Sequence, residues 1–119
     1  GSLLTWIESY LRGRGLLVRY GNSTSRRFDV PSGVPQGSLL APFLFTLFVN
    51  DIGGVIGDRF LMFADDVKIY REIKTQNDCQ QLQDTLLAVQ RWCGDNDMDL
   101  NISKCAVITF SRARNKIQF

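Results

Sequence analysis

Two adjacent aspartates, Asp65 and Asp66, are the residues of this sequence best suited to chemistry. Side chains alternate across a β-strand, so two neighbouring carboxylates can reach one metal ion only if they lie at a tight turn. Hard carboxylate oxygens suit Mg²⁺, and phosphoryl transfer makes frequent use of such sites. The apolar run 60–64 precedes the pair. We expect this run to be a strand buried on both faces, where charge needs a cation. An ordinary hairpin turn, in which aspartate is common, is the alternative.

The segment 31–38 is the second candidate because it contains two prolines and two glycines. This composition excludes a helix interior or a central strand. Glycines let the backbone approach a ligand, and a loop that leads into a helix presents N–H groups to a phosphate or a base. The alternative is a turn that only caps the next helix, with Ser38 as the N-cap residue.

Three elements are expected before residue 53. The apolar spacing of residues 3–12 predicts a short amphipathic helix, and residues 16–30 read as a hairpin. This hairpin could carry arginines on an exposed face that contacts a nucleic-acid backbone: Arg19, Arg26 and Arg27. Residues 39–52 predict a helix that is apolar on nearly all sides and therefore buried.

The second half of the chain completes the fold class. Residues 59–71 predict a hairpin around the two aspartates. Residues 75–92 predict an amphipathic helix, and the alternation in residues 105–110 predicts a strand. The order indicates an α+β fold, an antiparallel sheet backed by helices. We expect one domain made of four successive parts: 1–30, 31–52, 59–71 and 75–110.

The composition excludes several classes of mechanism. The chain has 119 residues and no histidine, so Ser-His pairs, Cys-His pairs and histidine-ligated zinc are absent from it. The net charge of +2 is small, but basic residues gather in 1–30 and 112–119 and acidic residues in 31–111. Such a distribution suits a cation-loaded site beside a polyanion, or ordinary solvated surface. Three cysteines without a CxxC pair and no bilayer-length apolar run indicate a soluble intracellular protein outside the membrane.

Three ordered motifs resemble the palm of reverse transcriptases. They are SGVPQGSLLAPFLFTLFVNDI, then FLMFADDVKIY, then RWC followed by DLNISKCAVITFSR. The resemblance extends over nearly the whole chain and is closest to the non-LTR, LINE-type and jockey-like retrotransposon enzymes. It implies an RNA-directed DNA polymerase that uses two Mg²⁺ ions, an RNA template, a DNA primer and deoxynucleoside triphosphates.

The resemblance also implies residue roles. Asp65 would be the principal metal ligand, Asp66 a second carboxylate, and Phe63 would lie near the primer terminus. The GVPQGS motif would border the incoming nucleotide and the template through Pro35, Gln36, Gly37 and Ser38. In the motif formed by Trp92, Leu100, Asn101 and Lys104, the lysine would stabilise or protonate the leaving pyrophosphate. An exposed lysine at a strand start is the alternative for Lys104.

One family feature does not match. The family's metal centre takes a further aspartate from an earlier palm strand, and neither Glu8 nor Asp29 stands in its motif. We therefore expect the chain to be the latter part of a palm, inactive or nearly so by itself. Its partners would then be the fingers, the first palm strand and the thumb of the parent polymerase.

Two alternatives remain from other classes. One is a noncatalytic nucleic-acid-binding remnant of a mobile element, whose arginines contact phosphates: Arg12, Arg14, Arg19, Arg26 and Arg27. The other is a structural fragment of a decayed element, with neither activity nor binding. Steep salt dependence without a Mg²⁺ effect would characterise the first.

Overall fold

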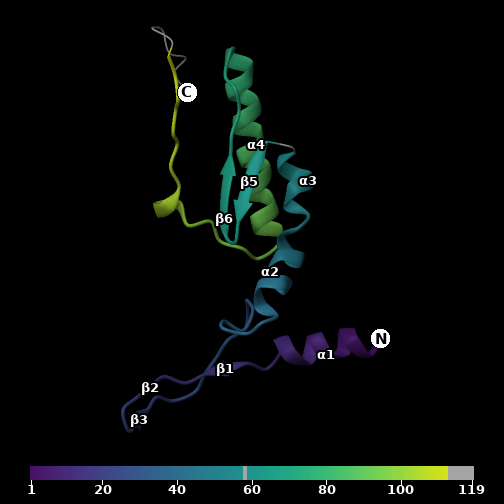
Figure 1. Ribbon diagram of the computed structural model, residues 1–119, viewed down its shortest axis with the longest axis vertical. Helices are drawn as coiled ribbons and strands as arrows, with labels where there is room; N and C mark the ends of the chain where they lie inside the picture. The colour runs from purple at the N-terminus through teal and green to yellow at the C-terminus, as the bar shows by residue number, and fades with distance from the viewer. Residues whose placement is uncertain (58, 113–119) are drawn as a thin grey trace. The chain divides into compact units, whose positions relative to one another are not determined.

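The computed structural model describes residues 1–57 and 59–112 and divides the chain into two compact units, Gly1–Phe48 and Val49–Phe119. Both contain helices and short antiparallel strand pairs, which confirms the α+β class (Figure 1). Within the described residues the strands form three separate two-stranded sheets. The described strands therefore form separate pairs, whereas the sequence predicted one larger sheet.

The first unit begins with helix α1, Ser2–Leu11 (Figure 1). A hairpin follows, in which β1, Gly15–Leu16, pairs with β4, Phe28–Asp29, and β2, Arg19–Tyr20, pairs with β3, Ser23–Thr24. The Val18 carbonyl accepts the Ser25 N–H at 2.9 Å between the two strand pairs. The predicted helix and hairpin are both confirmed, and the hairpin's strands are interrupted rather than continuous.

Helix α2, Ala41–Val49, confirms a helix within 39–52 but is shorter than expected. A turn at Asn50 and Asp51 ends it, and α3, Ile52–Ile56, begins a separate helix. The expected burial of the whole helix is wrong, because Phe43 and Leu47 are 63% and 61% exposed. An apolar helix is buried only where other elements cover each of its sides.

The second unit contains α3, the hairpin of β5, Phe60–Phe63, with β6, Asp66–Ile69, and helix α4, Gln76–Asp95 (Figure 1). Helix α3 packs against α4. Their buried side chains form the core of this unit: Ile52, Ile56, Cys79, Val89, Trp92 and Cys93. A Cβ built on Gly53 of α3 would lie 3.3 Å from the Phe60 ring, so β5 begins against this core.

Helix α4 has a well-defined start. The Thr75 Oγ1 atom accepts the Asp78 N–H, and the Asp78 carboxylate accepts the Thr75 N–H at 2.8 Å. This reciprocal capping box satisfies backbone donors that the first turn leaves without helical partners. The helix expected over 75–92 is confirmed and continues to Asp95.

Two expectations about strands are wrong. The run 60–64 is not buried on both faces, since Leu61 and Phe63 are 63% and 84% exposed; a two-stranded hairpin has too few neighbours to cover both faces. Residues 105–110 form no strand, and Val107 and Ile108 are exposed. Alternating side chains favour a strand, but a strand needs a partner for its backbone bonds.

The basic segment expected at 112–119 lies outside the described residues, apart from Arg112. Among the helices that the structure describes, none is both long enough and apolar enough to cross a membrane.

Candidate active site

The two aspartates lie where the sequence predicts, at the tip of the β5–β6 hairpin. Residues on the two strands pair in register from Phe60↔Ile69 to Phe63↔Asp66, which leaves Ala64 and Asp65 as a two-residue turn. Asp66 is thus the first residue of β6. The tight turn brings adjacent carboxylates to one end of the hairpin, and both residues are exposed.

The turn has a backbone conformation that sequence reasoning missed. Ala64 has φ = 52°, in the left-handed region that residues with a Cβ rarely adopt. Asp65 is not among the positive-φ residues. A positive φ at the first central residue alone is the pattern of a type II′ hairpin turn, where glycine is usual. Strained residues of this kind are common at functional sites, so the conformation of Ala64 supports a functional role for the turn.

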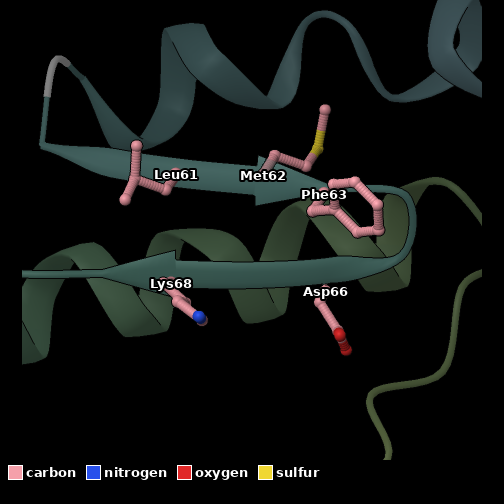
Figure 2. A pocket seen from close by; sticks show the side chains of 5 residues that line it. All are labelled: Leu61, Met62, Phe63, Asp66 and Lys68. Atoms are coloured by element: carbon pink, nitrogen blue, oxygen red, sulfur yellow. The ribbon is translucent and has the colours of Figure 1, made fainter.

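The side chains next to the turn line an open hollow of about 290 Å³ on the surface of the hairpin. Figure 2 shows its lining, formed by Leu61, Met62, Phe63, Asp66 and Lys68. Asp66 and Lys68 project from the same side of β6 (Figure 2), as strand alternation requires of residues two apart. The hollow thus combines an apolar wall with one carboxylate and one ammonium group.

Lys68 was missed from the sequence, although its spacing from Asp66 was a usable signal. A lysine two residues after a carboxylate on a strand shares its face. Lys68 is therefore a further candidate for contact with a phosphate at this hairpin.

The donor set fits Mg²⁺ in part. Two exposed carboxylates at one turn supply hard oxygen ligands and leave room for the waters that Mg²⁺ retains. Among residues 1–57 and 59–112, no group of three or more Asp, Glu, Cys or His side chains is arranged to hold a metal. Asp65 and Asp66 could hold an ion only with further ligands from substrate, water or other protein segments.

The 31–38 loop is irregular, as expected, and lies in the first unit. Gly33 and Gly37 have φ = 75° and 81°, conformations that glycine adopts without strain. The Ser38 Oγ atom accepts the Ala41 N–H at 3.1 Å. The Ser38 side chain therefore caps the first N–H of α2, but the expected N-cap position is wrong: α2 begins at Ala41, and Leu40 accepts the first helical bond, from the Leu44 N–H.

The exposure of the loop differs along its length. Gln36 and Gly37 are exposed, whereas Pro35 and Ser38 are half-buried. The middle of the loop is therefore the part that a nucleotide or template could reach. Ser38 is occupied by structural bonds, since its Oγ also accepts the Tyr10 hydroxyl at 2.6 Å.

The hairpin arginines fall into two groups. Arg19 and Arg26 are exposed, as the sequence predicts for contacts with a phosphate backbone. Arg27 is also exposed, but its Nη2 atom donates to the Gly13 carbonyl at 2.9 Å. Its guanidinium lies where a Cβ on Gly15 would be, so Arg27 holds the base of the hairpin together.

Lys104 is the last residue of the short 3₁₀ helix η1, Ile102–Lys104, and is exposed. Its N–H donates to the Asn101 carbonyl at 3.0 Å. Trp92, from the same motif, is buried on α4. The tryptophan therefore belongs to the core of the second unit, while the lysine is available to solvent.

Comparison with known proteins identifies the family. The reverse transcriptase (RNA-dependent DNA polymerase) family matches residues 2–119, and the chain belongs to this family. Relatives come from mobile elements of flies. The chain is 32% identical over 114 residues to a probable RNA-directed DNA polymerase from transposon X-element of Drosophila melanogaster, covering 91% of the chain and 13% of that protein.

Jockey elements give similar matches. The RNA-directed DNA polymerase from mobile element jockey of Drosophila funebris is 31% identical over 124 residues, covering 93% of the chain and 13% of that protein. The corresponding jockey protein of Drosophila melanogaster is 30% identical over 114 residues, covering 88% of the chain and 12% of that protein. The chain thus spans about an eighth of the length of these relatives. No solved structure matches it significantly. The resemblance to jockey-like reverse transcriptases is confirmed.

Proposed function

We propose that this chain is the segment of an RNA-directed DNA polymerase that supplies two carboxylates of its metal centre, Asp65 and Asp66. The observation that carries the proposal is the β5–β6 turn, which places both exposed carboxylates at one tip in a chain of the reverse transcriptase family. The names of the fly relatives support the same activity. Substrates would be deoxynucleoside triphosphates, an RNA template and a DNA primer.

Asp65 and Asp66 would hold Mg²⁺ between them. When bound, the metal would supply positive charge that stabilises the phosphoryl group being transferred and would make a primer hydroxyl more acidic. The chain's own part is to fix the carboxylates. Pairing of Phe63 with Asp66 locks the start of β6, and the two-residue turn restricts Asp65.

The neighbouring side chains would bind substrate. The exposed Phe63 ring borders the hollow and offers a flat apolar surface to a primer sugar or base. Lys68 and Lys104 would each place an ammonium charge within reach of phosphate oxygens, and Lys104 would donate a proton to the departing pyrophosphate. Gln36 and Gly37, at the exposed middle of the 31–38 loop, would border the nucleotide and the template.

Arg19 and Arg26 would contact the phosphate backbone of template or primer from the hairpin of the first unit. Their exposure supports this role. Each phosphate contact would contribute to a binding constant that falls as salt rises. Replacing either arginine by glutamine removes one phosphate contact. The slope of log binding constant against log salt concentration should then fall in magnitude by about 1.

The test is RNA-templated primer extension by the polymerase that contains this chain. We expect Mg²⁺-dependent incorporation of deoxynucleotides, and we expect little or none from the 119-residue chain alone, because it supplies two of the carboxylates that the family's centre uses. If the longer protein carries out no Mg²⁺-dependent nucleic-acid synthesis, the proposed function is refuted. Robust synthesis by the chain alone would refute the shared metal centre.

A metal-binding readout separates this function from a noncatalytic nucleic-acid-binding remnant. Mn²⁺, a paramagnetic substitute for Mg²⁺, should broaden the amide signals of residues 63–67 in the chain. The Asp65→Asn variant should lose this broadening, whereas the control Asp84→Asn, on the exposed side of α4, should keep it. A nucleic-acid affinity that changes neither when the metal is added nor in the Asp65→Asn variant would favour the noncatalytic remnant.

A further inference from the structure

The 31–38 loop makes few backbone hydrogen bonds of its own. Pro31 and Pro35 have no N–H to donate, and Gly33 and Gly37 populate many conformations when unfolded. Within the loop, the Ser38 N–H donates to the Pro35 carbonyl at 3.3 Å. Contacts from outside the loop must therefore define much of its shape.

Arg14 supplies such contacts at the start of the loop. Its Nη2 atom donates to the Ser32 carbonyl at 2.9 Å and to the Gly33 carbonyl at 2.6 Å. Its Nε atom donates to the carbonyl of Leu11, the last residue of α1, at 2.7 Å. One guanidinium thus joins the end of α1 to the first turn of the loop through charge-assisted bonds.

The backbone of Arg14 strengthens this link. Its carbonyl accepts the Val30 N–H at 2.9 Å, directly before the loop. A positive charge at the C-terminus of α1 is also favoured by the helix dipole. The position of Arg14 therefore has both a backbone and a side-chain cause.

Tyr10 supplies the second external contact, at the end of the loop. Its hydroxyl donates to Ser38 Oγ at 2.6 Å, and the same oxygen accepts the Ala41 N–H of α2. The Tyr10 ring stacks on Trp6 of α1 with centroids 5.4 Å apart and an interplanar angle of 12°. The stacked pair fixes the direction of the hydroxyl.

We propose that Arg14 and Tyr10 are positioning residues that hold the two ends of the 31–38 loop, so that its exposed middle at Gln36 and Gly37 is preorganised to receive the nucleotide and template. The inference rests on the proposed polymerase function. Both residues act through the loop and neither needs to touch substrate. This role differs from that of the exposed hairpin arginines, because the Arg14 guanidinium is already committed to three carbonyl groups.

Amide hydrogen exchange in the 119-residue chain tests the bracing directly. Arg14→Lys should accelerate exchange of the Val30 and Ser38 amides about tenfold or more, as expected for loss of a hydrogen bond from a charged donor. Lysine keeps the charge but not the planar fork. The matched control is Arg12→Lys, because the exposed Arg12 pairs with Glu8 and not with the loop.

Tyr10→Phe removes only the hydroxyl and keeps the ring that stacks on Trp6. Exchange of the Ala41 and Ser38 amides should accelerate by several-fold, the change expected for one neutral hydrogen bond. Tyr20→Phe is the control, because Tyr20 is 88% exposed on β2. Unchanged exchange in both Arg14→Lys and Tyr10→Phe would overturn the proposal.

Steady-state kinetics of the polymerase that contains the chain test the consequence. A misplaced loop should raise KM for the deoxynucleotide about tenfold in Arg14→Lys, with a smaller change in kcat. Normal KM in Arg14→Lys, together with an increase in Arg14→Met, would assign Arg14 a simple charge role and overturn the proposal. Faster exchange with unchanged KM in every variant would also overturn it.

The two hypotheses fail in different ways. If the longer protein synthesises no DNA, the proposed function is refuted, and the exchange rates still decide whether Arg14 and Tyr10 brace the loop. If the wild-type protein synthesises DNA but the exchange rates do not respond, the positioning role fails and the polymerase function stands.

Discussion

Replacing Ala64 by glycine should stabilise the second unit, although alanine-to-glycine changes usually destabilise. Ala64 has φ = 52°, a conformation that costs a residue with a Cβ about 1–2 kcal/mol. Glycine removes this strain but loses about 0.5–1 kcal/mol to the greater freedom of the unfolded chain. The net change is a gain of about 0–1.5 kcal/mol in the free energy of unfolding.

The matched control is Ala88→Gly, inside helix α4 of the same unit. There the same chemical change should cost about 1 kcal/mol. The two variants should differ by about 1–2.5 kcal/mol, which at about 4 °C per kcal/mol separates their Tm values by about 4–10 °C. Thermal unfolding followed by circular dichroism measures the difference. Equal losses in Tm for both variants would refute the strained turn.

Further predictions concern the core, the capping box and the cysteines. Ile56→Ala, in the α3–α4 core, should lower the free energy of unfolding by about 2–3 kcal/mol, whereas Ile108→Ala, 73% exposed, should change it by less than about 0.5 kcal/mol; denaturant titration measures both. Hydrogen bonds from the Thr75 hydroxyl and from backbone N–H groups lower the pKa of Asp78 from its usual 3.8. Its stabilising effect is therefore complete above the unfolded-chain pKa and is lost as pH falls through the lower folded pKa, so Asp78→Asn should flatten the acid limb of Tm against pH. Burial raises the pKa of the Cys93 thiol, so iodoacetamide should label the exposed Cys105 first and Cys93 only on unfolding; equal labelling by mass spectrometry would contradict the core.

Local patterns in the sequence were sufficient to predict the elements that carry the site. The apolar runs on either side of Asp65 and Asp66 predicted the β5–β6 hairpin, because strand alternation and a two-residue turn are local properties. The amphipathic pattern of residues 75–92 likewise predicted α4. These features do not require knowledge of distant neighbours.

The wrong expectations all concerned neighbours. Burial of Leu61 and Phe63, or of Phe43 on α2, depends on which elements cover each face, and composition does not specify that. A strand at 105–110 likewise requires a partner strand, and the alternation of side chains does not identify one. The bracing contacts of Arg14 join residues 18 and 19 positions apart through carbonyl groups, which have no sequence signature.

Single-turnover nucleotide incorporation by the polymerase that contains this chain tests the central claim most directly. Asp65→Asn should lower the incorporation rate about 10³-fold, equivalent to about 4 kcal/mol of lost transition-state stabilisation. Asp84→Asn, which removes one exposed carboxylate from α4, should leave the rate unchanged. An Asp65→Asn enzyme as fast as the Asp84→Asn control would contradict the assignment of the hairpin carboxylates to the metal centre.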